Sequence, residues 1–519
     1  MPMDQLSSAS LDWALTHITA FGDTDIFPVP FEFDCIKHGW NSLRPHLERQ
    51  DLETYRTRSH RRMLVPKSGG GYRVAIQLDP LDAIVYAALC YELAPTIEKA
   101  RIPQSRRIAC SYRVDLDPSG RLFASESGWP DYHNFSTELA ASGTYSHVLL
   151  ADIADFYNQI SSHRIVSALE MTGVPSLRAR NVESFLLQLT AKQTRGLPVG
   201  PSTSILLAEA LLIDVDNLLL RMGVPFTRFV DDFRIFCRSK HEAVRVHHDL
   251  TDYLYTAHRL VLQPWKTRIL KTTQFAESEL VDPAETERSA VVAKVRGLLD
   301  AILEQSGYAI GEGDLLSEDK DRAVRENLVE LFESCISNQP LHLGIARYLL
   351  RRASRLRTVV LNPLVFNNLG RLRSVFRETA NYMSACVSKR LAAQRGAQLA
   401  EFLKSSDYGQ LPFLRLWGIE VFLKRPDMLG DDEAFDLAMG FARELGTRPA
   451  AMMARRGRRL DWIRGLKESW TNYGPWDRRA IIYAGSILPP GEKRPWLGLI
   501  EESTEDPLER AVAKYSMVN

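Results

Sequence analysis

Three aspartates lie where short apolar segments end. Asp152 closes the apolar run 147–153, and Asp231 and Asp232 lie between two aromatic runs within 226–237. Two Mg²⁺ ions need several carboxylate oxygens held close together, with room left for substrate phosphates. Clustered carboxylates also repel one another unless a cation is near. A solvated hairpin turn is the alternative for Asp231 and Asp232 alone, but their phenylalanine-rich flanks favour a buried sheet and a metal site.

The surrounding pattern predicts the elements that position these residues. Residues 147–153 read as a buried strand, and 226–237 as two short strands joined at the aspartates. Residues 201–222 predict one long helix, with Pro201 at its start and Gly223 just past its end. Residues 61–78 predict a hairpin around the turn 68–71, followed by a helix that Asp79 caps.

Composition and charge limit the class of protein. The chain has 519 residues, 45% hydrophobic and 25% charged, with a net charge of +1, so a nucleic-acid partner must be inferred from local patches. Its six cysteines form no C-x-x-C pair, which argues against zinc and disulfides and favours a reducing compartment. The N-terminus lacks a signal-peptide pattern, and no run predicts a membrane span. We expect a cytoplasmic protein.

The character of the chain changes near residue 285. Before it, strand-like and helix-like segments alternate; after it, amphipathic helical segments dominate, as in 347–361 and 505–515. The expected organisation is α+β, with an N-terminal segment over 1–60, a mixed domain over 61–285 and an all-α domain over 286–519. Stacked helix pairs fit the last domain, although no strict sequence period marks them.

Four sequence blocks together carry a family resemblance. LLADIADFYNQI (149–160), GLPVGPSTSILLAEALL (196–212), FTRFVDDFRIF (226–236) and RLVLQPWKTRIL (259–270) resemble motifs A, B, C and D of reverse transcriptases, in the family's order and spacing. The resemblance covers roughly residues 60 to 285. It implies the fingers and palm of a right-hand polymerase, followed here by the α-helical, repeat-like domain, and a nucleotidyltransferase that joins dNTPs.

The resemblance also implies roles for single residues. Asp152, the backbone carbonyl of Ile153 and Asp231 would hold two Mg²⁺ or Mn²⁺ ions, with Asp232 supporting the second carboxylate position. Tyr157 falls at the steric-gate position, where an aromatic ring excludes a 2′-hydroxyl and favours deoxynucleotides. Core packing is the alternative for Tyr157 and the preferred interpretation of the neighbouring Phe156.

Further residues would contact the triphosphate. Lys67 and Arg73 flank the glycine turn of a hairpin that resembles the fingers loop, and Lys266 matches the motif D lysine that could protonate pyrophosphate. Solvated surface charges are the alternative for all three. Motif B departs from the family because Val199 replaces the usual glutamine, so nucleotide contact would rest on the backbone at Gly200.

The combination of a polymerase domain with a helical C-terminal half resembles bacterial defence-associated, abortive-infection reverse transcriptases. It implies DNA synthesis that serves phage resistance, either RNA-directed from a non-coding RNA or template-independent from a protein hydroxyl, and it is compatible with homo-oligomers. A non-catalytic RNA-binding scaffold with a palm-like fold is the alternative. A metal-dependent nuclease is disfavoured, because a nuclease needs no triphosphate clamp.

Arginines in the helical half form two candidate nucleic-acid contacts. Arginines three and four residues apart share one face of a helix and could follow a phosphate backbone. A solvated face or ion pairs between helices is the alternative. The candidates are Arg351, Arg352, Arg355, Arg455 and Arg458.

Overall fold

The computed structural model describes residues 4–67, 70–124, 128–190, 193–280, 318–337, 341 and 343–519. It divides into two compact units, Met1–Arg62 with Ala75–Asp282 and Met63–Val74 with Pro283–Asn519. The turn residues 68 and 69 and the expected boundary at 285–286 lie outside the described residues. The N-terminal segment expected over 1–60 belongs to the first unit, because α1 (Ser8–Phe21) packs against α4 (Pro80–Ala100).

A four-stranded antiparallel sheet forms the centre of the first unit. Its order is β4-β5-β3-β6, with β3 in register against both β5 and β6. Val148, Leu150, Phe236 and Phe275 form a buried cluster that Leu139 of α5 helps to cover. The predicted strands at 147–153 and 226–237 are therefore confirmed. The strand bounds are β3 (His147–Asp152), β4 (Phe226–Phe229), β5 (Asp232–Cys237) and β6 (Arg268–Lys271).

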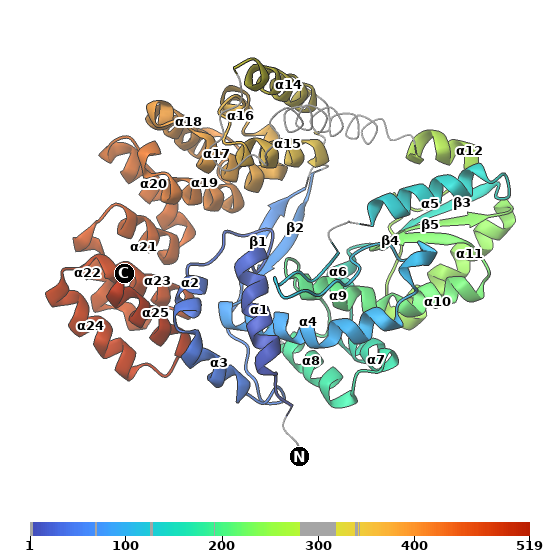
Figure 1. Ribbon diagram of the computed structural model, residues 1–519, viewed down its shortest axis with the longest axis horizontal. Helices are drawn as coiled ribbons and strands as arrows, with labels where there is room; N and C mark the ends of the chain where they lie inside the picture. The colour runs from blue at the N-terminus through green and yellow to red at the C-terminus, as the bar shows by residue number, and fades with distance from the viewer. Residues whose placement is uncertain are drawn as a thin grey trace. The chain divides into compact units, whose positions relative to one another are not determined.

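Helices surround this sheet in the first unit. Helix α4 packs against both α1 and α9 (Ser202–Leu211) (Figure 1). It begins where the Asp79 side chain accepts a hydrogen bond from the Leu81 amide, as the capping pattern predicts. Helices α5 and α11 both pack on the sheet. The remaining bounds are α2 (Glu32–His38), α3 (Trp40–Glu48), α5 (Trp129–Ala141), α6 (Phe156–Gln159), α7 (Ser162–Thr172), α8 (Ser176–Leu189), α11 (Lys240–Tyr253) and α12 (Thr272–Phe275).

The single helix predicted over 201–222 is wrong in one respect. The chain forms α9 (Ser202–Leu211) and α10 (Ile213–Arg221), and Leu212 lies between them at φ −83° and ψ −3°. The Leu212 amide still donates to the Ala208 carbonyl at 3.3 Å and also reaches the Glu209 carbonyl at 3.2 Å, so the turn tightens locally where the two helices meet. Glu209 and Asp216 nevertheless lie seven residues apart, which is about two helical turns, so both reach one side of the pair.

The predicted hairpin is confirmed as β1 (Arg61–Pro66) and β2 (Tyr72–Gln77). Near its tip the Lys67 amide donates to the Gly71 carbonyl at 3.1 Å. The base of the hairpin belongs to the first unit, whereas Met63–Val74 groups with the second. The hairpin therefore spans both compact units, and the mixed domain over 61–285 stays a prediction.

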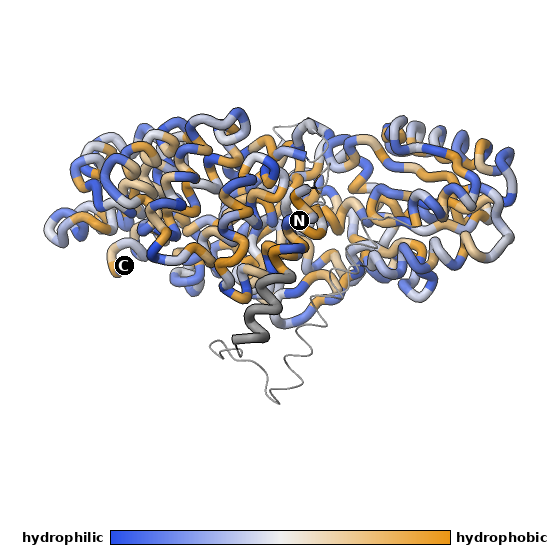
Figure 2. Tube along the Cα trace, turned by 90° about the horizontal axis from the view of Figure 1, so that it is seen from above, coloured by the Kyte–Doolittle hydropathy of each residue, from blue (hydrophilic) through white to orange (hydrophobic). Residues whose placement is uncertain are grey.

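Beyond that hairpin segment, the second unit is helical in its described part. Alternate helices pack on one another from α15 to α25, and hydrophobic and hydrophilic residues alternate along their turns (Figure 2). The bounds are α14 (Glu318–Ser337), α15 (Leu343–Arg355), α16 (Asn362–Asn367), α17 (Phe376–Cys386), α18 (Ala392–Ser405), α19 (Pro412–Lys424), α20 (Asp432–Leu445), α21 (Thr447–Arg456), α22 (Leu460–Glu468), α23 (Pro475–Ala484), α24 (Pro490–Ser503) and α25 (Pro507–Val518). Within the described ranges, no helix has the length and apolar character to cross a bilayer.

Candidate active site

The three aspartates meet at one end of the central sheet. Asp152 is the last residue of β3 and pairs directly across from Asp232, the first residue of β5. Directly opposed residues of antiparallel strands bring their Cβ atoms to within about 5.5 Å. Asp231 lies in the turn between β4 and β5, and its carbonyl accepts from the Ile153 amide at 3.3 Å. The structure therefore brings Asp152 together with Asp231 and Asp232, which lie 79 and 80 residues further along the sequence.

The pKa values of Asp231 and Asp232 are both raised. The pKa of Asp231 rises to about 6, because its half-buried position is poorly solvated and the charge of Asp152 is near. The pKa of Asp232 rises to about 7, through desolvation by its neighbours, a hydrogen bond with Asp152 and the nearby charge of Asp231. Three carboxylates in one place are costly without cations, so the cluster favours any positive charge that can enter.

One cation of the chain already lies against the cluster. The ammonium of Lys266 contacts Oδ2 of Asp152 at 2.5 Å, and partial burial opposes but does not cancel the rise that Asp152 causes in the pKa of the lysine. Asp152 itself is only 5% exposed, whereas the Lys266 side chain is 62% exposed. One ammonium offsets one of three carboxylates, and the remaining deficit fits a divalent cation.

The carboxylates of this cluster could bind Mg²⁺ if substrate phosphates completed the coordination. Among the residues that the structure describes, no group of three or more His, Cys, Asp or Glu side chains is arranged to hold a metal ion by itself. Mg²⁺ is commonly bound through one or two carboxylates plus substrate phosphates, rather than by a cage of protein side chains alone. The carboxylates of Asp152 and Asp231 fit that pattern of incomplete coordination.

Tyr157 is hydrogen-bonded to the segment that carries Gly200. The carbonyl of Tyr157, in α6, accepts from the Leu197 amide at 2.8 Å, and the tyrosine is half-buried. Gly200 has φ +137°, and a Cβ there would lie 2.6 Å from Oγ1 of Thr24 and 3.1 Å from the Ile76 carbonyl. Close packing against these two residues explains the glycine independently of any nucleotide.

Lys67 and Arg73 are both exposed on the hairpin segment Met63–Val74, which groups with the second unit. Their contact with the triphosphate stays a prediction.

The candidate arginines of the helical unit differ in their surroundings. Arg351 pairs with Glu378 at 2.7 Å, and Nε of Arg455 donates to Ser486 at 3.0 Å while its guanidinium lies over Tyr483. Arg355 and Arg458 are exposed, and Arg352 is half-buried. Arg351 thus forms an ion pair between helices, whereas Arg455 makes a hydrogen bond and a cation–π contact; a nucleic-acid contact of these arginines stays a prediction.

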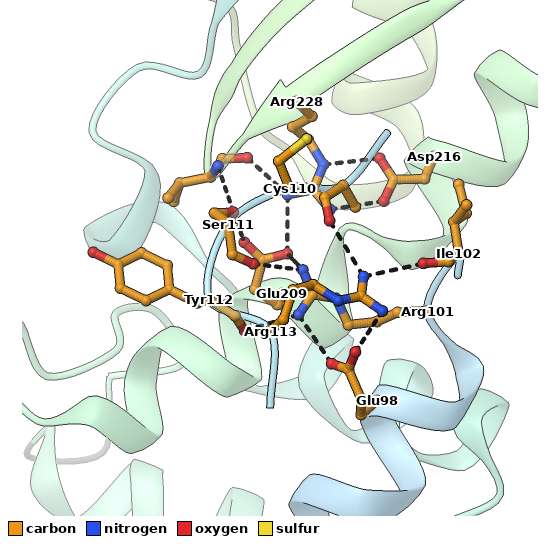
Figure 3. Close-up of polar contacts among 12 residues, drawn as sticks. Glu98, Arg101, Ile102, Cys110, Ser111, Tyr112, Arg113, Glu209, Asp216 and Arg228 are labelled. Carbon is orange, nitrogen blue, oxygen red and sulfur yellow. Dashed lines mark hydrogen bonds and ion pairs between the residues drawn. The ribbon is translucent and has the colours of Figure 1, made fainter. Parts of the chain in front are cut away.

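A buried ionic cluster behind the aspartate turn escaped the sequence analysis. Arg228 of β4 is fully buried and donates to Asp216 through Nε and Nη2, at 2.8 and 2.7 Å, and to Glu209 through Nη1 at 3.1 Å. Arg101 donates to the same Glu209 at 2.8 Å (Figure 3). A charged residue inside an apolar run was the available signal, because such residues are rarely buried unless paired.

Part of the chain matches a known protein family. Residues 65–279 match the family described as "Reverse transcriptase (RNA-dependent DNA polymerase)". A comparison with curated proteins gives no match.

Two solved structures resemble the chain weakly. Telomerase from Candida albicans, solved with a fragment of telomeric RNA, shares 12% identity and a TM-score of 0.33 over 75% of this chain and 65% of its own. Apo telomerase from Candida tropicalis shares 11% identity and a TM-score of 0.32 over 78% and 68%. This chain thus spans less than two thirds of the first telomerase.

Proposed function

We propose that residues 65–279, which match the reverse transcriptase family, are the polymerising domain of a DNA polymerase, and that this chain joins dNTPs into DNA by two-metal nucleotidyl transfer. The observation that carries the proposal is the meeting of Asp152, Asp231 and Asp232 at one sheet end inside the matched domain. Their shortage of positive charge is what a site for Mg²⁺ and a triphosphate requires.

The residues divide the work between them. Asp152, Asp231 and the Ile153 carbonyl would hold the Mg²⁺ ions, with Asp232 supporting them. When bound, such ions lower the pKa of the attacking hydroxyl and stabilise the leaving pyrophosphate. Lys266 holds its ammonium proton at Nζ beside Asp152, from where it can pass to the departing pyrophosphate. Lys67, Arg73 and the backbone at Gly200 would orient the triphosphate and sugar.

Replacing Tyr157 by Ala should weaken the discrimination between deoxynucleotides and ribonucleotides. The half-buried ring would exclude a 2′-hydroxyl by contact, and its removal opens that space. We expect the ratio of kcat/KM for dTTP to that for UTP to fall at least about tenfold. The Tyr157→Phe variant keeps the ring and should keep the ratio, so a ratio that is unchanged in Tyr157→Ala would remove the gate role.

The experiment that tests the proposed function also separates its two forms. Purified full-length protein is incubated with Mg²⁺ and each labelled dNTP, before and after nuclease treatment of any co-purifying RNA, beside the Asp231→Asn variant. Incorporation that is lost with the RNA indicates an RNA-directed enzyme. Incorporation that survives and stays attached to denatured protein indicates template-independent, protein-primed synthesis. No Asp231-dependent incorporation under either condition refutes the polymerase and leaves the RNA-binding scaffold.

The helical unit supports a finer proposal about architecture. Ion pairs between its helices recur at similar sequence separations: 27 residues for Arg351–Glu378, 29 for Arg415–Glu444 and 28 for Arg464–Glu492. Together with the packing of alternate helices, this regularity favours a repeat of helix pairs. Exposed Arg355 and Arg458 are the arginines that remain best suited to contact a phosphate backbone.

The joining of a reverse transcriptase domain to this helical unit supports the bacterial antiphage role. In that role the DNA product, rather than a genomic copy, limits phage growth, and a non-coding RNA is the partner in the RNA-directed form.

A further inference from the structure

The turn that carries Asp231 is conformationally strained. Val230 precedes Asp231 and has φ +57°, in the left-handed region. A β-branched residue is a genuine outlier there, because its side chain crowds the backbone. Such a conformation persists only where surrounding contacts hold it.

Both backbone polar groups of Val230 are held. Its amide donates to Oγ of Ser111 at 2.9 Å, and its carbonyl accepts from Nη1 of Arg228 at 2.8 Å. The amide belongs to the peptide unit before the Val230 Cα and the carbonyl to the unit after it. Fixing both units fixes φ and ψ of Val230, and with them the direction in which the chain enters Asp231.

Glu209 organises the two groups that hold Val230. Its Oε1 accepts from Oγ of Ser111 at 2.7 Å, and its Oε2 accepts from Nη1 of Arg228 at 3.1 Å. A serine hydroxyl has one proton, so donation to Glu209 leaves the oxygen free to accept from the Val230 amide. Figure 3 shows Ser111, Glu209 and Arg228 converging in this way.

Hydrogen bonds of the neighbouring residues hold Ser111 next to the turn. The segment around it lies beside β4, where the Arg228 amide donates to Ile108 at 2.7 Å and the Cys110 amide donates to Arg228 at 3.0 Å. Arg101 then donates to the Ser111 carbonyl at 2.8 Å. Ser111, Glu209 and Arg228 are at most 1% exposed, so water cannot readily replace a lost partner.

We propose that Ser111, Glu209 and Arg228 form a clamp that holds Val230 in its left-handed conformation and so positions Asp231 for nucleotidyl transfer. In the hydrogen bonds of these three residues, none of their side chains binds the carboxylate of Asp152, Asp231 or Asp232, so they are positioning residues. The inference rests on the proposed function, and it assigns a positioning role to Ser111, which lies outside the four sequence blocks, and to Glu209 and Arg228, which lie within two of them. The competing explanation is that the cluster only stabilises the fold.

The test removes the hydroxyl of the clamp in the full-length protein. Ser111→Ala and wild type are compared on poly(rA) annealed to oligo(dT), with dTTP and Mg²⁺. We expect kcat to fall about tenfold with the KM for dTTP unchanged, because one buried hydrogen bond is lost. The matched control is Ser136→Ala, since Ser136 is fully buried and also bonds an arginine, Arg234, and a carbonyl, Tyr132. Its kcat should stay within about twofold of wild type.

A second background separates positioning from general stability. Glycine adopts positive φ at little cost, so Val230→Gly needs the clamp less. In that background the Ser111→Ala penalty on kcat should shrink to about threefold or less. Hydrogen exchange on the protein without nucleotide supplies a readout that needs no activity: Ser111→Ala should speed exchange in peptides covering 226–237, and Ser136→Ala should not.

The outcomes distinguish this inference from the proposed function. If wild type incorporates dTTP while Ser111→Ala behaves like Ser136→Ala, or loses equal activity in both Val230 backgrounds, the clamp is refuted and the polymerase stands. If wild type incorporates no more than Asp231→Asn here and with each labelled dNTP before and after nuclease treatment, the proposed function fails. The exchange rates over 226–237 then decide by themselves whether Ser111 holds the turn.

Discussion

Asp231→Asn should lower dNTP incorporation by at least about a thousandfold, because a ligand for the catalytic metals loses its charge and several kcal/mol of transition-state stabilisation. The amide is nearly isosteric with the carboxylate, so the turn should keep its shape. The measurement is single-turnover incorporation with saturating Mg²⁺ and dTTP. Asp252→Asn, at an exposed carboxylate of α11, is the matched control and should retain wild-type activity.

Stability should separate lost chemistry from lost folding in this variant. Asp231 lies beside Asp152 and Asp232 and is repelled by both, so removing its charge relieves repulsion in metal-free protein. The unfolding midpoint in EDTA should therefore not fall. Cells that express Asp231→Asn should also lose phage resistance if synthesis serves defence. Retained incorporation in a folded Asp231→Asn protein would overturn the assignment of the site.

Arg228→Met should destabilise the protein by about 3–5 kcal/mol, which is the range for removing one partner of a buried ion pair. Arg228 is fully buried and provides hydrogen bonds to Asp216 and Glu209, which are 2% and 1% exposed. Its loss leaves carboxylates in the interior with Arg101 as the remaining cation that contacts Glu209. Urea unfolding followed by circular dichroism measures the change.

Two variants make the Arg228 result specific. Arg107→Met removes a surface arginine that pairs with the half-exposed Glu138, and it should cost less than about 1 kcal/mol. Adding Asp216→Asn to Arg228→Met removes one uncompensated charge, so the double variant should be more stable than Arg228→Met alone. Additive losses would show that charge pairing is not what Arg228 contributes.

Much of the site could be predicted from local sequence. The strand ending at Asp152 and the paired strands around Asp231 follow from short apolar runs with turn residues between them, and local propensity is sufficient for such elements. The capped start of α4 follows from Asp79 and Pro80 in the same way. The long helix was predicted with one error, because nothing local marks Leu212 as a break.

The sequence by itself therefore determined which residue types stand at the strand ends, and through them the expectation of a metal site and the resemblance to reverse transcriptases. Only the tertiary structure decided what lies behind them. Ser111 reaches Val230 across 119 residues, and Glu209 reaches Ser111 across 98. It also decided that Met63–Val74 groups with the helical unit rather than with the carboxylates. The physical reason is that local patterns fix backbone conformation, whereas the partners of a buried charge are chosen by the packing of distant segments.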